Sequence, residues 1–125
     1  MQVRTKIWIE QDGAVMLSDW RVALLEAVDA TGSLAEAARQ MDVPYRTAWQ
    51  KLKALEDRWG LALLDTASGG ADGGASRLTP QAQELVHRFR QITAGVQEEA
   101  AARFAAAFRD IPAVLNVSSG DPLPD

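Results

Sequence analysis

The strongest constraint on the fold is the stretch SLAEAARQMDVPYRTAWQKLKALEDRW at residues 33–59, which predicts two helices joined by a very tight turn. The first helix is short and rich in alanine. The second opens with Pro44 at its first position, where proline is tolerated, and ends near Trp59, before Gly60. This pattern is typical of a helix-turn-helix, whose second helix lies in the major groove of DNA.

The first of these two helices has its own start signal. Ser33 and Glu36 have the S-x-x-E spacing of a capping box, in which each residue satisfies a backbone N–H of the other. Ala37 and Ala38 are small, as residues must be where two helices cross closely. Asp42 and Val43 form the predicted turn.

The second helix has two different faces. An apolar stripe at i, i+4, i+7 and i+11 consists of Ala48, Leu52, Leu55 and Trp59. The opposite side carries Arg46, Gln50, Lys53 and Asp57. Arginine and glutamine read guanine and adenine through paired hydrogen bonds, although a polar helix face can also be merely solvated.

The candidate DNA-binding residues come from the helix-turn-helix and from the strand that follows it. They are Ser33, Tyr45, Arg46, Thr47, Gln50, Lys51, Lys53, Ser76 and Arg77. Two readings stay open for Tyr45, a contact with DNA or support of the turn. Trp49 lies on the shoulder of the helix, and we expect it to pack against the neighbouring helix.

The segment before the helix-turn-helix predicts a β-hairpin and a helix. Residues 5–10 alternate apolar and polar, Asp12-Gly13 is a strong two-residue turn signal, and residues 14–16 can form the return strand. Ser18 is a plausible N-cap for a helix to about Thr31, with an apolar stripe of Trp20, Leu24, Leu25 and Val28. Gly32 would end that helix.

The segment after the helix-turn-helix predicts a wing. Residues 61–66 favour a short strand, residues 67–76 a glycine-rich loop, and Arg77-Leu78 a return strand. The loop lacks the G-K-[ST] ending of a phosphate-binding loop, so we expect no nucleotide site there.

Thr79-Pro80 begins a long helix as N-cap and first residue. Its near-heptad stripe indicates dimerisation, although a frayed C-terminal helix would also fit; the stripe contains Leu85, Phe89, Ile92, Val96, Ala100, Phe104 and Phe108. The predicted fold is mainly α, a winged helix-turn-helix with an N-terminal β-hairpin. Its parts are a DNA-binding domain at 1–79, a dimerisation helix at 80–111 and a disordered tail at 112–125.

Composition excludes most other chemistry. The chain has no cysteine and one histidine, His87, which excludes thiolate and histidine-based metal sites and disfavours most histidine-dependent catalysis. We expect neither an enzyme nor a cofactor. It has no signal peptide and no apolar run long enough to span a membrane, which predicts a cytoplasmic protein.

Charge gives a mixed indication. The net charge of −4 opposes DNA binding, but residues 31–60 contain five bases and four acids, whereas residues 1–30 contain three bases and five acids. A local basic surface on an acidic body is therefore expected. The acidic total leaves an alternative, a winged-helix protein-interaction module without a DNA role.

These motifs resemble the N-terminal DNA-binding domain of the ModE family of molybdate-dependent transcriptional regulators. The resemblance runs from about Lys6 to Phe108, and its marks are L-x-E-A-V-D-A-T-G-S-L at 24–34, A-A-R-Q-M at 37–41, V-P-Y-R-T-A-W at 43–49, T-A-S-G-G-A-D-G-G-A-S at 66–76 and R-L-T-P at 77–80. The pieces S-L-A-E-A-A and L-T-P are also similar to LysR-type regulators.

The resemblance implies a homodimeric regulator that binds double-stranded DNA at molybdate-transport or molybdenum-enzyme genes. Full-length family members add a molybdate-binding module after the dimerisation helix, and this sequence ends at Asp125. We therefore expect either a short member of the family, which the starting methionine and proline-rich ending favour, or a fragment of a longer one, and no tightly bound small molecule.

Overall fold

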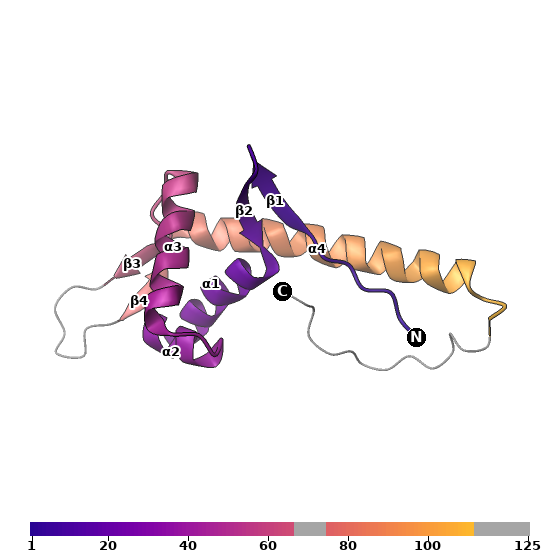
Figure 1. Ribbon diagram of the computed structural model, residues 1–125, viewed down its shortest axis with the longest axis horizontal. Helices are drawn as coiled ribbons and strands as arrows, with labels where there is room; N and C mark the ends of the chain where they lie inside the picture. The colour runs from indigo at the N-terminus through magenta and orange to yellow at the C-terminus, as the bar shows by residue number, and fades with distance from the viewer. Residues whose placement is uncertain (67–74, 112–125) are drawn as a thin grey trace. The chain divides into compact units, whose positions relative to one another are not determined.

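The computed structural model describes residues 1–66 and 75–111, and Figure 1 shows its elements. They are β1 (Trp8–Gln11), β2 (Ala14–Ser18), α1 (Asp19–Thr31), α2 (Leu34–Gln40), α3 (Tyr45–Trp59), β3 (Leu64–Thr66), β4 (Ser76–Leu78) and α4 (Pro80–Ala107). The chain forms two compact units, one from Trp8 to Phe89 and one that combines Met1–Ile7 with the chain from Arg90 onward. The predicted fold class, a mainly α winged helix-turn-helix, is confirmed.

The hairpin β1–β2 turns at Asp12-Gly13, as predicted. Both residues have positive φ, 52° and 80°, which a type I′ turn requires and which matches the twist of the strands. A bulge between Ile9 and Glu10 leaves Met16 without a partner in the register. Because the bulge breaks the alternation of side chains, Met16 and Leu17 are both buried although they are neighbours.

The residues before β1 depart from the prediction, which began the strand at residue 5. Thr5 donates from its backbone N and from Oγ1 to Oε1 of Gln97 in α4, at 2.9 and 2.8 Å. Gln97 Nε2 donates to the backbone oxygen of Val3 at 2.9 Å. The alternating pattern therefore reflects an extended segment held by one glutamine, and strand pairing starts only at Trp8.

Helix α1 begins and ends where the sequence predicts. Ser18 accepts a hydrogen bond from the backbone N of Arg21, and Gly32 adopts φ 74° in the left-handed region and donates to Val28. The core is made by one face of each element around α1; its buried members include Leu17, Val22, Leu24, Leu25, Val28, Leu34, Ala37, Ala38, Ala48, Leu52, Leu55, Leu63, Leu78 and Phe89. Trp20 is only partly buried against this cluster.

The capping box predicted at the start of α2 is only half formed. Ser33 Oγ accepts from the backbone N of Glu36 at 3.2 Å, which is the predicted half of the box. The other half is replaced, because the carboxylate of Glu36 pairs with Arg39 at 3.0 Å and the backbone N of Ser33 donates to Thr31 Oγ1 at 3.3 Å.

The turn from α2 to α3 is closed by backbone hydrogen bonds from Met41, Asp42 and Val43 to the last turns of α2. Asp42 has φ 57°, and its N–H bonds the carbonyl of Arg39 while that of Val43 bonds the carbonyl of Ala38. This is the Schellman arrangement with aspartate in the position usually taken by glycine. Pro44 is correspondingly the N-cap of α3 rather than its first residue, and the predicted helix start is wrong by one position.

Strands β3 and β4 pair antiparallel, with Leu64, Asp65 and Thr66 opposite Leu78, Arg77 and Ser76. The predicted strand at 61–66 is too long, because the carbonyls of residues 62 and 63 accept hydrogen bonds from Thr79 instead of a partner strand. Most of the predicted glycine-rich loop and all of the predicted tail lie outside the described residues.

Helix α4 starts at Pro80 with Thr79 as its N-cap, whose Oγ1 accepts from the backbone N of Ala82 at 3.1 Å, as predicted. It ends at Ala107, four residues earlier than expected. Two i,i+4 ion pairs support its exposed surface, Glu84 with Arg88 and Glu99 with Arg103. The Arg88 guanidinium, hydrogen-bonded to Glu84, lowers the pKa of that carboxyl.

Two glycines should respond to the same substitution in opposite ways. Gly60 ends α3 with φ 67°, whereas Gly95 lies inside α4, and a Cβ at either position would meet nothing within 4 Å. Gly60→Ala should lower the free energy of unfolding by about 1 kcal/mol through backbone strain. Gly95→Ala should raise it by about 0.5–1 kcal/mol. Urea unfolding followed by circular dichroism measures both, and equal effects of the two changes would contradict this account of Gly60.

Candidate nucleic-acid interface

Helix α3 exposes the face that the sequence predicts. Ala48, Leu52 and Leu55 are buried, with exposed fractions of 0, 2 and 2 %. The side opposite them is exposed and consists of Arg46, Gln50, Lys53 and Asp57. At about 100° per residue the buried stripe leaves this row pointing away from the core, as a reading helix requires.

The first half of α3 is positively charged. From Tyr45 to Lys53 it contains Arg46, Lys51 and Lys53 and no acidic residue. Within the residues that the structure describes, the side chains of Arg46 and Lys51 form no hydrogen bond and no ion pair. Since the N-terminus of a helix also carries partial positive charge, this end of α3 is suited to the phosphates of DNA despite the net charge of −4.

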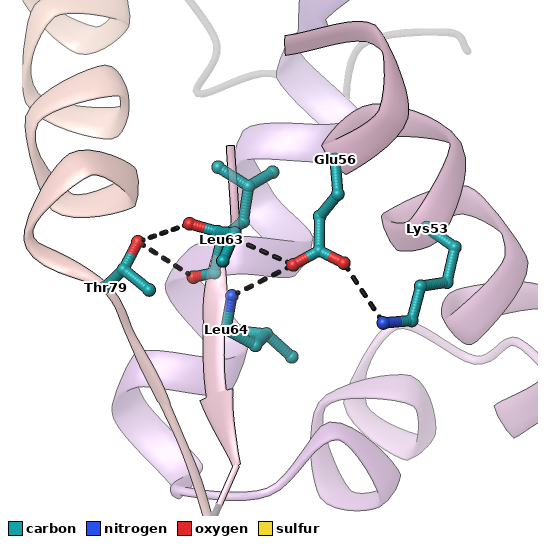
Figure 2. Close-up of polar contacts among 6 residues, drawn as sticks. Lys53, Glu56, Leu63, Leu64 and Thr79 are labelled. Carbon is teal, nitrogen blue, oxygen red and sulfur yellow. Dashed lines mark hydrogen bonds and ion pairs between the residues drawn. The ribbon is translucent and has the colours of Figure 1, made fainter. Parts of the chain in front are cut away.

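The acid that follows, Glu56, is used inside the fold. Its side chain is only 14 % exposed, and Oε2 accepts from the backbone N–H groups of Leu63 and Leu64 at 2.7 and 3.4 Å. Oε1 pairs with Nζ of Lys53 at 3.2 Å (Figure 2). One carboxylate therefore connects α3 to the first residues of the wing, which we define as β3 and β4, and holds Lys53 beside them.

The wing is also fixed from its other end. Thr79 Oγ1 donates to the carbonyl of Ala62 at 2.8 Å and lies 3.5 Å from that of Leu63 (Figure 2). The backbone N of Thr79 also donates to the carbonyl of Leu63, at 3.0 Å. The backbone N of Ser76 donates to the carbonyl of Gly32 at 2.8 Å, which joins β4 to the turn between α1 and α2. The base of the wing thus keeps one position relative to α3.

The end of α3 is held by the N-terminal hairpin. Arg58 donates from Nη1 to the carbonyl of Val15 at 2.9 Å, and Trp59 donates from Nε1 to the carbonyl of Met16 at 2.7 Å. The bulge at Met16 leaves that carbonyl without a strand partner, so it can accept from the indole. Arg58 consequently has a structural contact, and the exposed cations of α3 lie toward its start.

The predicted site residues fall into two groups. Tyr45, Arg46, Gln50, Lys51, Lys53 and Arg77 are exposed, and Thr47 is half-buried beside them. Ser33 uses its hydroxyl to cap α2, and Ser76 is only 7 % exposed, so the structure offers little of either side chain to a partner. Contacts of all nine with DNA stay predictions.

The prediction that Trp49 packs against the neighbouring helix is wrong. It is 45 % exposed rather than packed against the neighbouring helix, and Nζ of Lys53 lies 5.7 Å from the centroid of its ring.

The sequence did not reveal the role of Glu56, which is recognisable there only as one of two adjacent acids, Glu56 and Asp57. Nothing in its spacing indicates the backbone groups that it accepts from, because these lie beyond the helix end at residues 63 and 64.

Residues 21–83, half of the 125-residue chain, match the family described as bacterial regulatory helix-turn-helix protein, lysR family. The chain belongs to this lysR family. The match covers α1, the helix-turn-helix and the wing, which are the elements that form the candidate interface.

Relatives among known proteins confirm the resemblance to the ModE family. The chain is 38% identical over 88 residues to the molybdenum-pterin-binding protein MopB of Rhodobacter capsulatus, covering 70% of this chain and 32% of that protein. It is 40% identical over 70 residues to the molybdenum transport protein ModE of Herbaspirillum seropedicae, covering 56% of this chain and 26% of that protein. The chain thus spans about a third or less of the length of these relatives.

Solved structures show the same fold. The DNA-binding domain of CbnR, in a complex with DNA, matches with a TM-score of 0.55 and 24% identity over 70% of this chain and 94% of that one. Full-length LysG from Corynebacterium glutamicum matches with a TM-score of 0.51 and 21% identity over 75% of this chain and 29% of that one.

The described residues contain no further candidate site. Between residues 1–66 and 75–111, acids and the histidine never gather in a group that could hold a metal ion. No described helix combines the length and the apolar character needed to cross a membrane.

The role of Glu56 can be tested beside its neighbour. Glu56→Ala leaves the N–H groups of residues 63 and 64 without their acceptor and should lower the free energy of unfolding by about 1–3 kcal/mol. Asp57→Ala, on the exposed face, should change it by less than about 0.5 kcal/mol. Amide hydrogen exchange at Leu63 should accelerate only in Glu56→Ala; equal protection in both variants would show that Glu56 does not hold the wing.

Proposed function

We propose that this chain is the DNA-binding part of a transcription regulator, with α3 as the helix that enters the major groove. The observation that carries this proposal is the start of α3, where a row of exposed polar side chains lies among cations and no acid. Arg46 and Gln50 can read base edges, and Lys51 and Arg77 can reach phosphates. The lysR family membership and the DNA complex of CbnR support the same assignment.

We further propose that the regulated genes belong to molybdate uptake or to molybdenum enzymes. The support is the names of the relatives, a molybdenum-pterin-binding protein and molybdenum transport proteins. These proteins are about three times longer than the matched segment, so their ligands are not assigned to this chain.

The alternative, a protein-interaction module, rests on the acidic total alone. It does not explain why Glu56 is engaged in the fold while Arg46 and Lys51 point outward. DNA binding accounts for that separation of charge.

A homodimer is the assembly that we propose for DNA binding. Past the winged unit, α4 exposes Ile92 and Val96 by 46 and 41 %, and Phe108, which directly follows the helix, is 39 % exposed. All three lie on the stripe that the near-heptad spacing predicted. The rings of Phe104 and Phe108 stack with centroids 4.9 Å apart. Apolar side chains in a row on a helix are typical of pairing with a second helix.

The reading role of α3 predicts a loss of binding in the double variant Arg46→Ala/Gln50→Ala. Each lost base contact should weaken binding to a duplex selected from random sequences by about 1–3 kcal/mol and relax the choice of base at its position. Fluorescence anisotropy at fixed salt measures the affinity. The control is Gln83→Ala/Arg88→Ala on the exposed surface of α4, which removes the same groups. If the first variant folds and keeps both affinity and base preference, α3 is not the reader.

If the chain is a homodimer held by its apolar stripe, the variant Phe104→Glu/Phe108→Glu should be monomeric, because it places two negative charges in the interface. Light scattering should give about twice the 13.5 kDa mass of the chain for the wild type and a value near one chain mass for the variant. The variant should also lose tight binding, because two readers about 34 Å apart engage successive turns of the groove. A monomeric wild type that binds a palindromic site cooperatively would disprove this arrangement.

A further inference from the structure

One row of exposed side chains on α3 runs beside the base-reading face and shares only Lys53 with it. Tyr45, Trp49 and Lys53 follow one another at i, i+4 and i+8, so they lie in line along the helix. Tyr45 and Trp49 are 54 and 45 % exposed, and the side chain of Lys53 is 52 % exposed. Large aromatic side chains are seldom left in water unless a partner covers them.

The contacts of Glu56 show which side of α3 this row occupies. Lys53, at the end of the row, pairs with Glu56, whose other oxygen accepts from Leu63 and Leu64 at the base of the wing. Figure 2 shows Lys53 and Leu64 on either side of that carboxylate. The row therefore follows the side of α3 that is nearer to the wing.

The donors of this row favour an anion. An indole has an N–H donor and no acceptor, and an ammonium group has only donors. The indole N–H of Trp49 has no acceptor among residues 1–66 and 75–111, unlike that of Trp59, which bonds Met16. The ammonium of Lys53, which pairs with Glu56, also lies over the ring of Trp49 and brings a second donor to the same place.

We propose that Trp49 donates its indole N–H to a phosphate of the DNA strand that passes between α3 and the wing, with the ammonium of Lys53 beside it. The proposal rests on the proposed function and adds a residue to it. Trp49 lies about 80° around the helix from the row of Arg46 and Gln50, since successive residues are about 100° apart. That displacement places it against the wall of the groove, where the backbone runs, rather than against the base edges.

The variant Trp49→Phe tests this directly because it keeps the aromatic ring and removes only the N–H. Binding should weaken by about ten- to a hundredfold, the effect of one lost hydrogen bond to a charged group. The loss should be the same for the selected duplex and for an unrelated one, since a phosphate contact carries no sequence information. Trp8→Phe is the matched control, because Trp8 is 49 % exposed in β1 and donates to Glu10, and its affinity should equal that of the wild type.

Replacing single phosphates by uncharged methylphosphonates locates the contact. One position in each half-site should weaken the wild type and have little effect on Trp49→Phe. The proposal is overturned if Trp49→Phe binds like the wild type, if both proteins respond equally at every phosphate, or if the loss is confined to one base pair and follows its replacement. Failure of the wild type to bind any duplex would instead refute the proposed function.

Discussion

The geometry of the proposed interface depends on the carboxylate of Glu56. A helix alone could present Arg46 and Gln50, but a winged helix also needs its wing at a fixed place beside the helix. Glu56 provides this by accepting from the backbone at residues 63 and 64, just beyond the turn at Gly60. The contact is short and largely shielded from water, so the loss of its acceptor would leave polar backbone groups unsatisfied.

The same contact resolves the apparent conflict between an acidic chain and a DNA-binding role. DNA affinity depends on where the charges lie, and the fold engages Glu56 in the base of the wing and Glu36 with Arg39. Arg58 donates to the carbonyl of Val15 at the far end of α3, so it does not belong to the positive surface at the start of that helix. What remains outward on the first half of α3 is positive, so a local basic surface exists on a body whose total charge is −4.

The sequence predicted those features that depend on neighbouring residues. Caps at Ser18 and Thr79, the left-handed glycines 32 and 60 and the buried stripe of α3 each follow from spacing within a few positions, and all are present. Four features depend on partners distant in sequence or on the competition between local bonds, and these were missed. Glu56 accepts hydrogen bonds from residues beyond its helix, and Gln97 accepts from Thr5. Glu36 pairs with Arg39 instead of completing the capping box, and Trp49 stays exposed instead of packing against the neighbouring helix.

Chemical-shift mapping of the backbone amides on titration with a selected duplex tests the central claim most directly. The account predicts that the largest shifts fall on Tyr45–Lys53 and on Arg77, and that the buried residues of α1 shift little. Shifts confined to surfaces away from α3 and the wing, in a titration that saturates, would contradict it.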